Sequence, residues 1–405
     1  MSERHGIVVT GLGVVSPIGI GTEQFWRALL DGVVGTSELT LLDAASRAGY
    51  KGGEVRGFDA VAYGRRVDQA GLSRAAQFAV AAAAMALDES GVTRAGVDLR
   101  RVGVCFGTVI ASRPAVETWV RRLATPAQGA SGAAAAWHDP TVLSRAPAAE
   151  FGLRGPNLVI PTACAAGNSA IAFGADAIRR GWADAMVVGG ADELSLAMLM
   201  MFASFRALAP DAVRPFDLNR RGLMLAEGAA ALVLESEAHA AGRGARPYGR
   251  ILGYGNHADA YHMTAPHPDG LGAVRSMEAA LRAADVGPRD VDYISAHGTG
   301  TPSNDPIEAK AIRVVLGPAA DSVPVSSIKS MLGHTQGAAS AIEAVSCLLA
   351  IRDGIVPPNV NYETPDPACP LEIVANTPRP ARVDVALSNA FGFGGNIECV
   401  VFGRP

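Results

Sequence analysis

The sequence contains no apolar run long enough to cross a bilayer, and no apolar signal core at its start, which reads M-S-E-R-H-G. A membrane-spanning helix needs about 20 predominantly apolar residues, and a secretory signal needs an apolar segment near the N-terminus. We therefore expect no membrane association. Charge is also scarce: charged residues make up 18% of the chain and the net charge is -4, so nothing indicates bulk nucleic-acid binding.

Cysteine is infrequent and shows no paired spacing. There are five cysteines, an odd number, and no C-x-x-C pair, so neither a disulfide framework nor a cysteine-type zinc site is indicated. His257, His262 and His267 follow one another at intervals of five, which fits neither one helical face nor a common zinc pattern. We expect no metal and a reducing, cytoplasmic location.

The chain does have the apolar content of a large folded protein. Of its 405 residues 49% are hydrophobic, and apolar runs typical of buried strands alternate with segments typical of buried helices in both halves. This alternation favours α/β layers. Strands are predicted at 7–9, 102–106, 158–160, 185–190, 291–295, 323–326 and 383–388, and a further strand ends near residue 234. Helices are predicted after Thr22, from Ser73 to about residue 87, and at 168–180, 274–284, 307–316 and 338–351. A loop is predicted at 125–136.

The segment Gly11-x-Gly13 follows the first strand and invites a dinucleotide-binding interpretation. The third glycine of that fingerprint would fall at Ser16, which is followed by Pro17. We therefore disfavour a nucleotide site at this turn.

The stretch around Cys164 is the strongest candidate for chemistry. It reads N-L-V-I-P-T-A-C-A-A-G, with an apolar strand before the cysteine and a helix-forming segment after it. A thiol at a helix N-terminus lies beside unpaired N–H groups and the positive end of the helix dipole, so we expect it to lose its proton more easily. The alternative, a small buried core cysteine, is equally compatible with this position alone.

Three later motifs change that balance. They are A-H-G-T-G-T around His297, I-K-S-M-L-G-H ending at His334, and N-A-F-G-F-G-G at 389–395. Each follows a predicted strand, and strand ends are where open α/β sheets place their sites. A single histidine after a strand is usually structural, but one cysteine and two histidines in four such turns favour a shared site.

With these motifs in this order, the whole chain resembles the β-ketoacyl-acyl-carrier-protein synthases, the condensing enzymes of the thiolase superfamily. The resemblance runs from V-V-T-G-L-G-V-V-S-P to the glycine-rich loop near the end. It implies a thiolase-like fold of two similar α/β halves in an α-β-α-β-α arrangement, with residues 1–250 carrying the cysteine and 251–405 carrying both histidines. The chain looks like a stand-alone elongating synthase of fatty-acid or polyketide systems.

The resemblance also implies a mechanism. Cys164 accepts an acyl group from a thioester. A malonyl group on an acyl carrier protein then loses carbon dioxide, and His297 and His334 donate hydrogen bonds to the enolate oxygen that forms. The carbanion attacks the acyl-cysteine, and backbone N–H groups of Cys164 and Phe393 stabilise the second oxyanion. Two neutral imidazoles suit this task, provided that a partner fixes each tautomer.

Further residues take expected roles from the resemblance. Lys329 and Glu308 match positions of a polar network that supports the histidines, although Glu308 at a helix start could simply be solvated. Thr299 and Thr301 match contacts of the phosphopantetheine arm, and Ile110 matches a position at the acyl tunnel. No other cofactor is implied.

A basic surface is expected to receive the carrier protein. Acyl carriers are acidic, so a mildly acidic synthase needs local positive charge to bind one. Arg65, Arg66 and Arg206 match positions near the tunnel mouth, although they could be ordinary solvated arginines. The resemblance further implies a homodimer, or a heterodimer with a related subunit.

Two departures from the family pattern and two alternatives stay open. Ile397 stands where the glycine-rich loop usually has an amide, and Ala226 stands where a glycine is usual. The protein could instead be a priming or acyltransferase-like synthase, or a non-elongating partner subunit, although Cys164 argues against the latter. The sequence does not reveal the acyl chain or the pathway.

Overall fold

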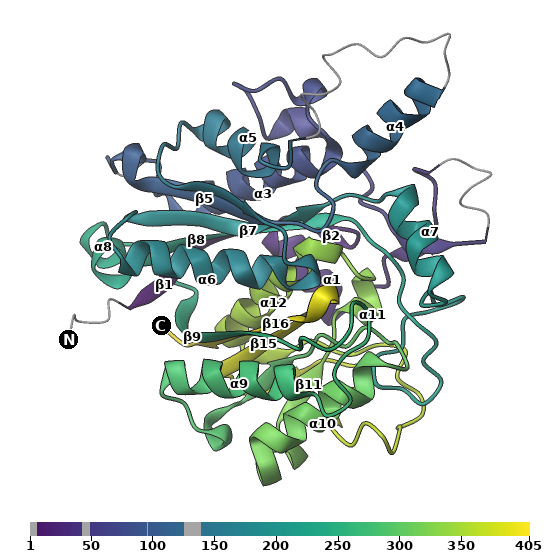
Figure 1. Ribbon diagram of the computed structural model, residues 1–405. Helices are drawn as coiled ribbons and strands as arrows, with labels where there is room; N and C mark the ends of the chain where they lie inside the picture. The colour runs from purple at the N-terminus through teal and green to yellow at the C-terminus, as the bar shows by residue number, and fades with distance from the viewer. Residues whose placement is uncertain (1–5, 43–48, 95, 125–138) are drawn as a thin grey trace.

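A computed structural model describes residues 6–42, 49–94, 96–124 and 139–405 (Figure 1). The loop predicted at 125–136 lies outside these residues. Within them, no helix is both long enough and apolar enough to span a bilayer.

Both halves of the chain build the same arrangement of five strands. The first half contains β1 (Ile7–Ser16), β5 (Val102–Gly107), β6 (Asn157–Ile160), β7 (Ala185–Asp192) and β8 (Gly228–Ser236), and the second contains β9 (Gly249–Ala258), β10 (Tyr293–Ser295), β11 (Pro324–Ser326), β15 (Val385–Gly392) and β16 (Asn396–Gly403). The spatial orders are β6-β5-β7-β8-β1 and β11-β10-β15-β16-β9, so equivalent strands occupy equivalent places. The expectation of two similar halves is confirmed; the division after residue 250, which falls inside β9, stays a prediction.

The helices form three layers around these strands. α3 (Arg74–Ser90) and α5 (Val142–Phe151) cover the outer face of the first half, and α9 (Leu271–Ala284) and α10 (Asn304–Leu316) cover that of the second (Figure 1). α6 (Ala166–Arg179) and α12 (Ala339–Asp353) lie between the halves and contact strands of both. Such central helices must be apolar on all sides, and α12 is buried from Ala339 to Ile351. The result is the expected α-β-α-β-α arrangement.

The Gly11-x-Gly13 segment serves packing. Both glycines lie inside β1, under α3. A Cβ at Gly11 would lie 2.1 Å from the carbonyl oxygen of Ala86, and a Cβ at Gly13 would lie 2.0 Å from that of Ala82. Only glycine permits this close approach of helix to strand, which gives the motif a structural explanation.

The remaining elements are short or connect the layers. They are α1 (Thr22–Leu30), α4 (Arg113–Ala124), α7 (Leu196–Ser204), α8 (Glu237–Gly242), α11 (Lys329–Leu332), β2 (Gly19–Ile20), β3 (Thr36–Glu38), β4 (Lys51–Gly53), β12 (Ile355–Val356), β13 (Glu372–Ile373) and β14 (Arg379–Pro380). Ser73 caps α3 as predicted, because its hydroxyl accepts from the N–H of Ala76. Thr22 does not cap α1: it is the first helical residue, and Gly21 occupies the N-cap position.

The exposure of β6 differs from a second expectation, that this strand is buried. The run Leu158–Ile160 forms a strand as predicted, but it is not buried in the chain. β6 is the outermost strand of the first half, where it pairs only with β5 among the described strands, and both Asn157 and Leu158 are exposed. An apolar sequence therefore lies at an open sheet edge.

Candidate active site

The four sequence motifs meet at one cavity. Cys164 follows β6, His297 follows β10, His334 follows α11 after β11, and Phe393 follows β15. β10 pairs in parallel with both β11 and β15, which brings three of the loops to one edge of the sheet. Residues of all four motifs line one cavity.

Cys164 sits in a tight turn between strand and helix. The turn Ala163–Ala165 runs directly into α6, and Ala163 has a φ of 52°, a left-handed conformation that non-glycine residues seldom adopt. Gly392 lies opposite, where a Cβ would come within 3.2 Å of the backbone nitrogen of Cys164. The lack of a side chain lets the 392–395 loop approach, and the backbone N–H of Phe393 acts to lower the pKa of the thiol.

Burial dominates the acidity of this thiol. Burial raises the pKa of Cys164 to about 12, while the positive charge of Lys329 acts in the opposite direction. The expectation that position alone would make the thiol ionise easily is therefore wrong for the free chain. The negative sulfur must instead be stabilised as the reaction proceeds, by groups such as the Phe393 N–H.

Both histidines have one ring nitrogen committed as an acceptor. The N–H of Gln336 donates to Nδ1 of His334 at 3.1 Å, and the ammonium of Lys329 lies 3.4 Å from Nδ1 of His297. An ammonium and a backbone N–H can only donate, so Nδ1 is the acceptor in both rings. In each neutral ring the proton therefore lies on Nε2. Burial, followed by the charge of Lys329, holds both histidine pKa values well below 6.5. The rings cross at 80° with centroids 5.5 Å apart.

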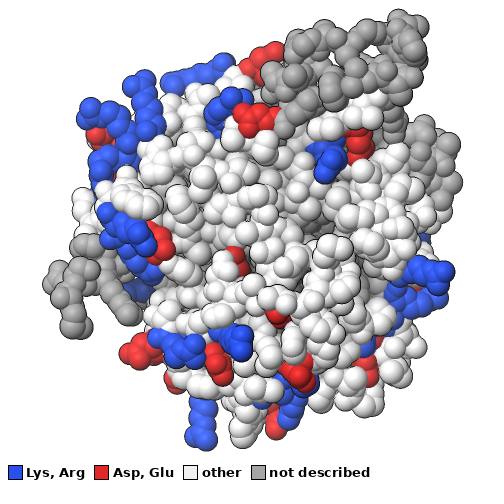
Figure 2. All heavy atoms as spheres, in the orientation of Figure 1, with Lys and Arg blue, Asp and Glu red and all other residues white. Residues whose placement is uncertain are grey.

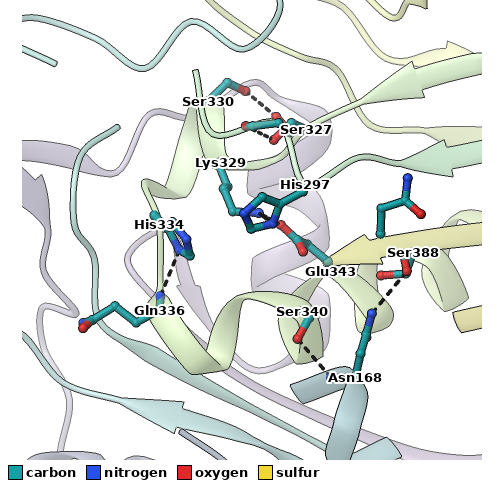
Figure 3. A network of polar contacts seen from close by, with 12 residues as sticks. Asn168, His297, Ser327, Lys329, Ser330, His334, Gln336, Ser340, Glu343 and Ser388 are labelled. Atoms are coloured by element: carbon teal, nitrogen blue, oxygen red, sulfur yellow. Dashed lines mark hydrogen bonds and ion pairs between the residues drawn. The ribbon is translucent and has the colours of Figure 1, made fainter. Parts of the chain in front are cut away.

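A buried ion pair supports this arrangement (Figure 3). Lys329 donates to the carboxylate of Glu343, which projects from α12 beneath His297, and both side chains are 2% exposed. Burial raises the pKa of Glu343 to about 7, and the charge of Lys329 opposes that rise. Glu343 thus fixes the amine that fixes the tautomer of His297.

Glu308 supports the same loop from its other side. Its carboxylate accepts from the backbone N–H groups of His297 and Gly298, both at 2.8 Å. The side chain is fully buried, so the solvated alternative is wrong. Burial raises the pKa of Glu308 to about 7 despite these two donors.

Comparison with known proteins agrees with this geometry. Residues 4–240 match the family model described as β-ketoacyl synthase, N-terminal domain, and residues 248–363 match the corresponding C-terminal domain. Together the two matches cover most of the chain. This chain is a member of the β-ketoacyl synthase family.

Relatives match it over nearly their whole length. The 3-oxoacyl-[acyl-carrier-protein] synthase 2 of Synechocystis is 39% identical over 99% of this synthase and 98% of its own length. The tetracenomycin polyketide synthase ketoacyl synthase alpha subunit of Streptomyces glaucescens is also 39% identical, with the same coverage. This 3-oxoacyl-acyl-carrier-protein synthase and this polyketide synthase subunit are therefore equally similar to the chain in sequence.

Solved structures confirm the thiolase-like fold. The ishigamide ketosynthase/chain length factor superposes with a TM-score of 0.94 at 38% identity over all of both chains. A type II polyketide ketosynthase, solved in complex with its acyl-carrier protein, gives a TM-score of 0.91 at 33% identity, again over both full chains.

The predicted substrate-contact residues of this synthase occupy different places. Thr299 and Thr301 line the cavity, and their hydroxyl groups lie 2.9 Å apart. Ile110 packs in the apolar cluster that contains Phe202 and Phe393, and its N–H donates to Asp192. Its role at the acyl tunnel stays a prediction.

The three arginines expected to bind a carrier are exposed and belong to two different segments of the chain. The backbone N–H groups of Arg65 and Arg66 donate to Glu150 of α5. Arg206 directly follows α7, between the cavity residues Phe202 and Ala207. Arg206 is thus the one of the three that adjoins the cavity in sequence.

Both departures from the family pattern are accommodated by their neighbours. The methyl group of Ala226 fits because Gly53 and Gly333 present no side chain there: a Cβ at either position would lie 2.7 or 3.2 Å from it. Ile397 is buried and lines the cavity. The glycine-rich loop is held without an amide at 397, through bonds from the Asp259 N–H to Gly395 and from the Gly394 N–H to Met263.

Sequence reasoning missed three supporting residues. Glu343 holds Lys329, Gln336 orients His334, and Asp192 accepts from the N–H groups of Val109, Ile110 and Gly337. A signal existed for Glu343, because it is the single charged residue in the apolar stretch A-S-A-I-E-A-V-S-C. Gln336 acts through its backbone, so its side-chain type gave no indication.

Proposed function

We propose that this synthase catalyses a decarboxylative Claisen condensation between an acyl thioester and malonyl-acyl-carrier protein, giving 3-oxoacyl-acyl-carrier protein. The observation that carries the proposal is the pairing of two different donor sets around one thiol. Phe393, whose backbone N–H acts to lower the pKa of the thiol, and two neutral histidines with Nε2 protons line the cavity of Cys164. Each donor set suits one of the two oxyanions of such a reaction.

In the first half-reaction the acyl group moves to Cys164. The sulfur attacks the thioester carbonyl, the bond to the carrier sulfur breaks, and the thiol proton ends on the released carrier thiol. Negative charge on the tetrahedral oxygen is met by backbone N–H groups of Cys164 and Phe393.

In the second half-reaction the malonyl group loses carbon dioxide. The electron pair of the broken bond forms an enolate, whose oxygen accepts hydrogen bonds from Nε2 of His297 and His334. The carbanion then attacks the acyl-cysteine carbonyl, and the Cys164 sulfur leaves and takes up a proton. Lys329 and Glu308 keep the histidines in place, as their contacts with His297 and its loop support.

Substrates are delivered on the phosphopantetheine arm of an acyl carrier protein, and Thr299 and Thr301 contact that arm. Arg206, with Arg65 and Arg66, contributes positive charge for carrier docking. Charged side chains on the face in Figure 2 lie mostly toward its periphery, around a largely uncharged centre. Local positive charge is therefore enough to give a carrier a preferred orientation on this mildly acidic protein.

The synthase works as a dimer, with a second copy or with a related subunit. The open, partly apolar edge of β6 supports this, because such edges are usually covered in native proteins. The chain operates in the cytoplasm, where a reducing environment keeps the nucleophilic thiol free. All five cysteines are unpaired in the structure.

Intact-mass measurement after incubation with a panel of acyl carriers tests the proposal. Wild type should gain one acyl mass, Cys164→Ala should gain none, and Cys369→Ala, which alters a buried cysteine outside the cavity lining, should behave like wild type. Addition of malonyl carrier should then release the 3-oxoacyl product. Acylation without C–C bond formation would favour the acyltransferase-like alternative, and no acylation would favour the silent partner subunit.

A further inference from the structure

We propose that Glu117 is a positioning residue that selects the acyl chain by anchoring the first turn of α7. The inference rests on the proposed function, because it concerns the acyl group that Cys164 accepts. Glu117 lies on α4, which projects from the body above α7 (Figure 1). It belongs to none of the motifs that identify the family.

The carboxylate of Glu117 binds the N-terminus of α7 from outside the helix. It accepts from the hydroxyl of Ser195, the N-cap residue, and from the backbone N–H of Ala197 at 3.0 Å. The Ser195 hydroxyl in turn lies 3.4 Å from the N–H of Met198. The first N–H groups of a helix lack partners within it and favour a negative charge, so Glu117 completes a cap that Ser195 alone satisfies only in part.

α7 leads from this cap to the nucleophile through aromatic contacts. The ring of Phe202 stacks on that of Phe393 with centroids 5.5 Å apart, and the ring of Phe205 meets Phe393 edge-on at 6.2 Å. Phe202 and Phe393 both line the cavity that contains Cys164. Gly392, next to Phe393, packs against the backbone of Cys164. A shift of α7 therefore reaches the surroundings of the sulfur within two side-chain contacts.

The two ends of α7 are restrained differently. Leu199 and Phe202 are buried in an apolar cluster, which holds the middle and end of the helix to the body. Leu194 and Met198 belong to the same cluster beside the first turn, and Glu117 adds a polar restraint there from outside the helix. Loss of this contact should free the first turn while leaving the helix folded, because the apolar anchors remain.

Ile110, the residue predicted at the acyl tunnel, packs in the same region. It belongs to the apolar cluster of Leu199 and Phe202, and it lies at the start of the segment that leads into α4. Asp192 fixes that segment by accepting from the N–H groups of Val109 and Ile110. Glu117 is thus the polar contact from α4 to the first turn of α7, beside the apolar cluster that Ile110 joins.

The experiment compares acylation across chain lengths with decarboxylation. Glu117→Ala removes the acceptor, Glu117→Gln keeps the shape with a weaker acceptor, and Thr118→Ala is the matched control on the exposed side of the same helix. Cys164 acylation is followed by intact mass with short, medium and long acyl carriers. Carbon dioxide release from malonyl carrier is followed in parallel, and thermal unfolding reports the fold.

For Glu117→Ala we expect the ratio of acylation rates between long and short chains to change by about fivefold to tenfold, the scale of one net intramolecular hydrogen bond. Glu117→Gln should give a smaller change in the same direction, and Thr118→Ala none. Decarboxylation should stay within about twofold, because it depends on His297 and His334. The carboxamide variant decides the question if Glu117→Ala does not fold.

An unchanged chain-length profile in folded variants would overturn the inference. A uniform loss at all chain lengths, with decarboxylation lost in proportion, would also overturn it, because that pattern marks a merely structural residue. A wild-type chain that accepts no acyl group would instead overturn the proposed function on which the inference depends.

Discussion

Replacing Lys329 by methionine should separate the two tasks of this buried amine. The ammonium donates to Glu343 and lies 3.4 Å from Nδ1 of His297. Methionine has a similar length but no charge and no donor. The substitution therefore removes an ion-pair partner and the group that fixes a catalytic tautomer, with little change in volume.

The stability cost follows from the buried carboxylate that remains. Removing one partner of a buried ion pair typically costs about 3–5 kcal/mol. Glu343 can relieve part of this cost by taking up a proton, because burial already raises its pKa to about 7 in the presence of Lys329. The folded-state pKa exceeds the unfolded value of 4.5, so the carboxyl stabilises the folded variant in mild acid. That contribution is lost as pH rises through the folded pKa.

The catalytic cost follows from His297. Without a donor at Nδ1, the ring no longer holds its proton on Nε2, and losing one oxyanion donor costs about 3–4 kcal/mol, or on the order of a hundredfold to a thousandfold in rate. The charge of Lys329 also helps to keep the His297 pKa low, after burial. In the variant this pKa should rise, so that protonation of His297 adds an acid limb to the pH profile.

Decarboxylation of malonyl carrier should be measured from about pH 5.5 to 8, with thermal unfolding at the same pH values. In wild type neither His297 nor His334 should titrate near 6.5, the ordinary histidine value, because burial holds both pKa values well below it. Lys329→Met should be slow and acid-sensitive, and the double variant with Glu343→Gln should regain stability but not rate. A folded Lys329→Met protein that decarboxylates at the wild-type rate, with the wild-type pH profile, would refute this reasoning.

Three further predictions concern the histidines, the acyl tunnel and the carrier. His297→Ala or His334→Ala should slow decarboxylation by about a hundredfold to a thousandfold but acylation much less; equal losses in both assays would contradict the oxyanion role. Ile110→Trp should shorten the accepted acyl chain in a mass-spectrometric panel, and an unchanged profile would remove Ile110 from the tunnel. Arg65→Glu with Arg206→Glu should slow turnover of carrier-bound substrate, most at low salt, and spare small thioester mimics; equal loss with both substrates would exclude docking.

The sequence predicted the layers and the meeting of Cys164, His297 and His334 because each feature leaves a local pattern. Apolar runs mark strands, and small-residue turns after them mark the cavity edge. β9 and β16 escaped prediction: β9 contains three glycines among mixed residues, and Gly253 and Gly255 pack so tightly against α9 that a Cβ would lie 2.6 and 2.1 Å from its carbonyl oxygens. Close backbone packing of this kind leaves no hydrophobic period to detect.

A supporting residue could be predicted from sequence only where it lies in a recognisable motif and acts through its side chain. Lys329 lies in the I-K-S-M-L-G-H motif, whereas its partner Glu343 comes from a separate helix whose register no sequence period specifies. The acidity of Cys164 depends on burial by four loops, which a strand–turn–helix pattern cannot indicate. Sequence thus identifies reactive groups more readily than their electrostatic surroundings.

The position of β6 has a kinetic consequence. This outermost strand ends four residues before Cys164, so the segment that delivers the nucleophile is also the segment with an open edge. If a second subunit covers that edge, the order of the cysteine turn depends on how much of the protein is assembled. Specific activity should then fall on dilution, and the enzyme's own concentration becomes one of the variables that set its rate.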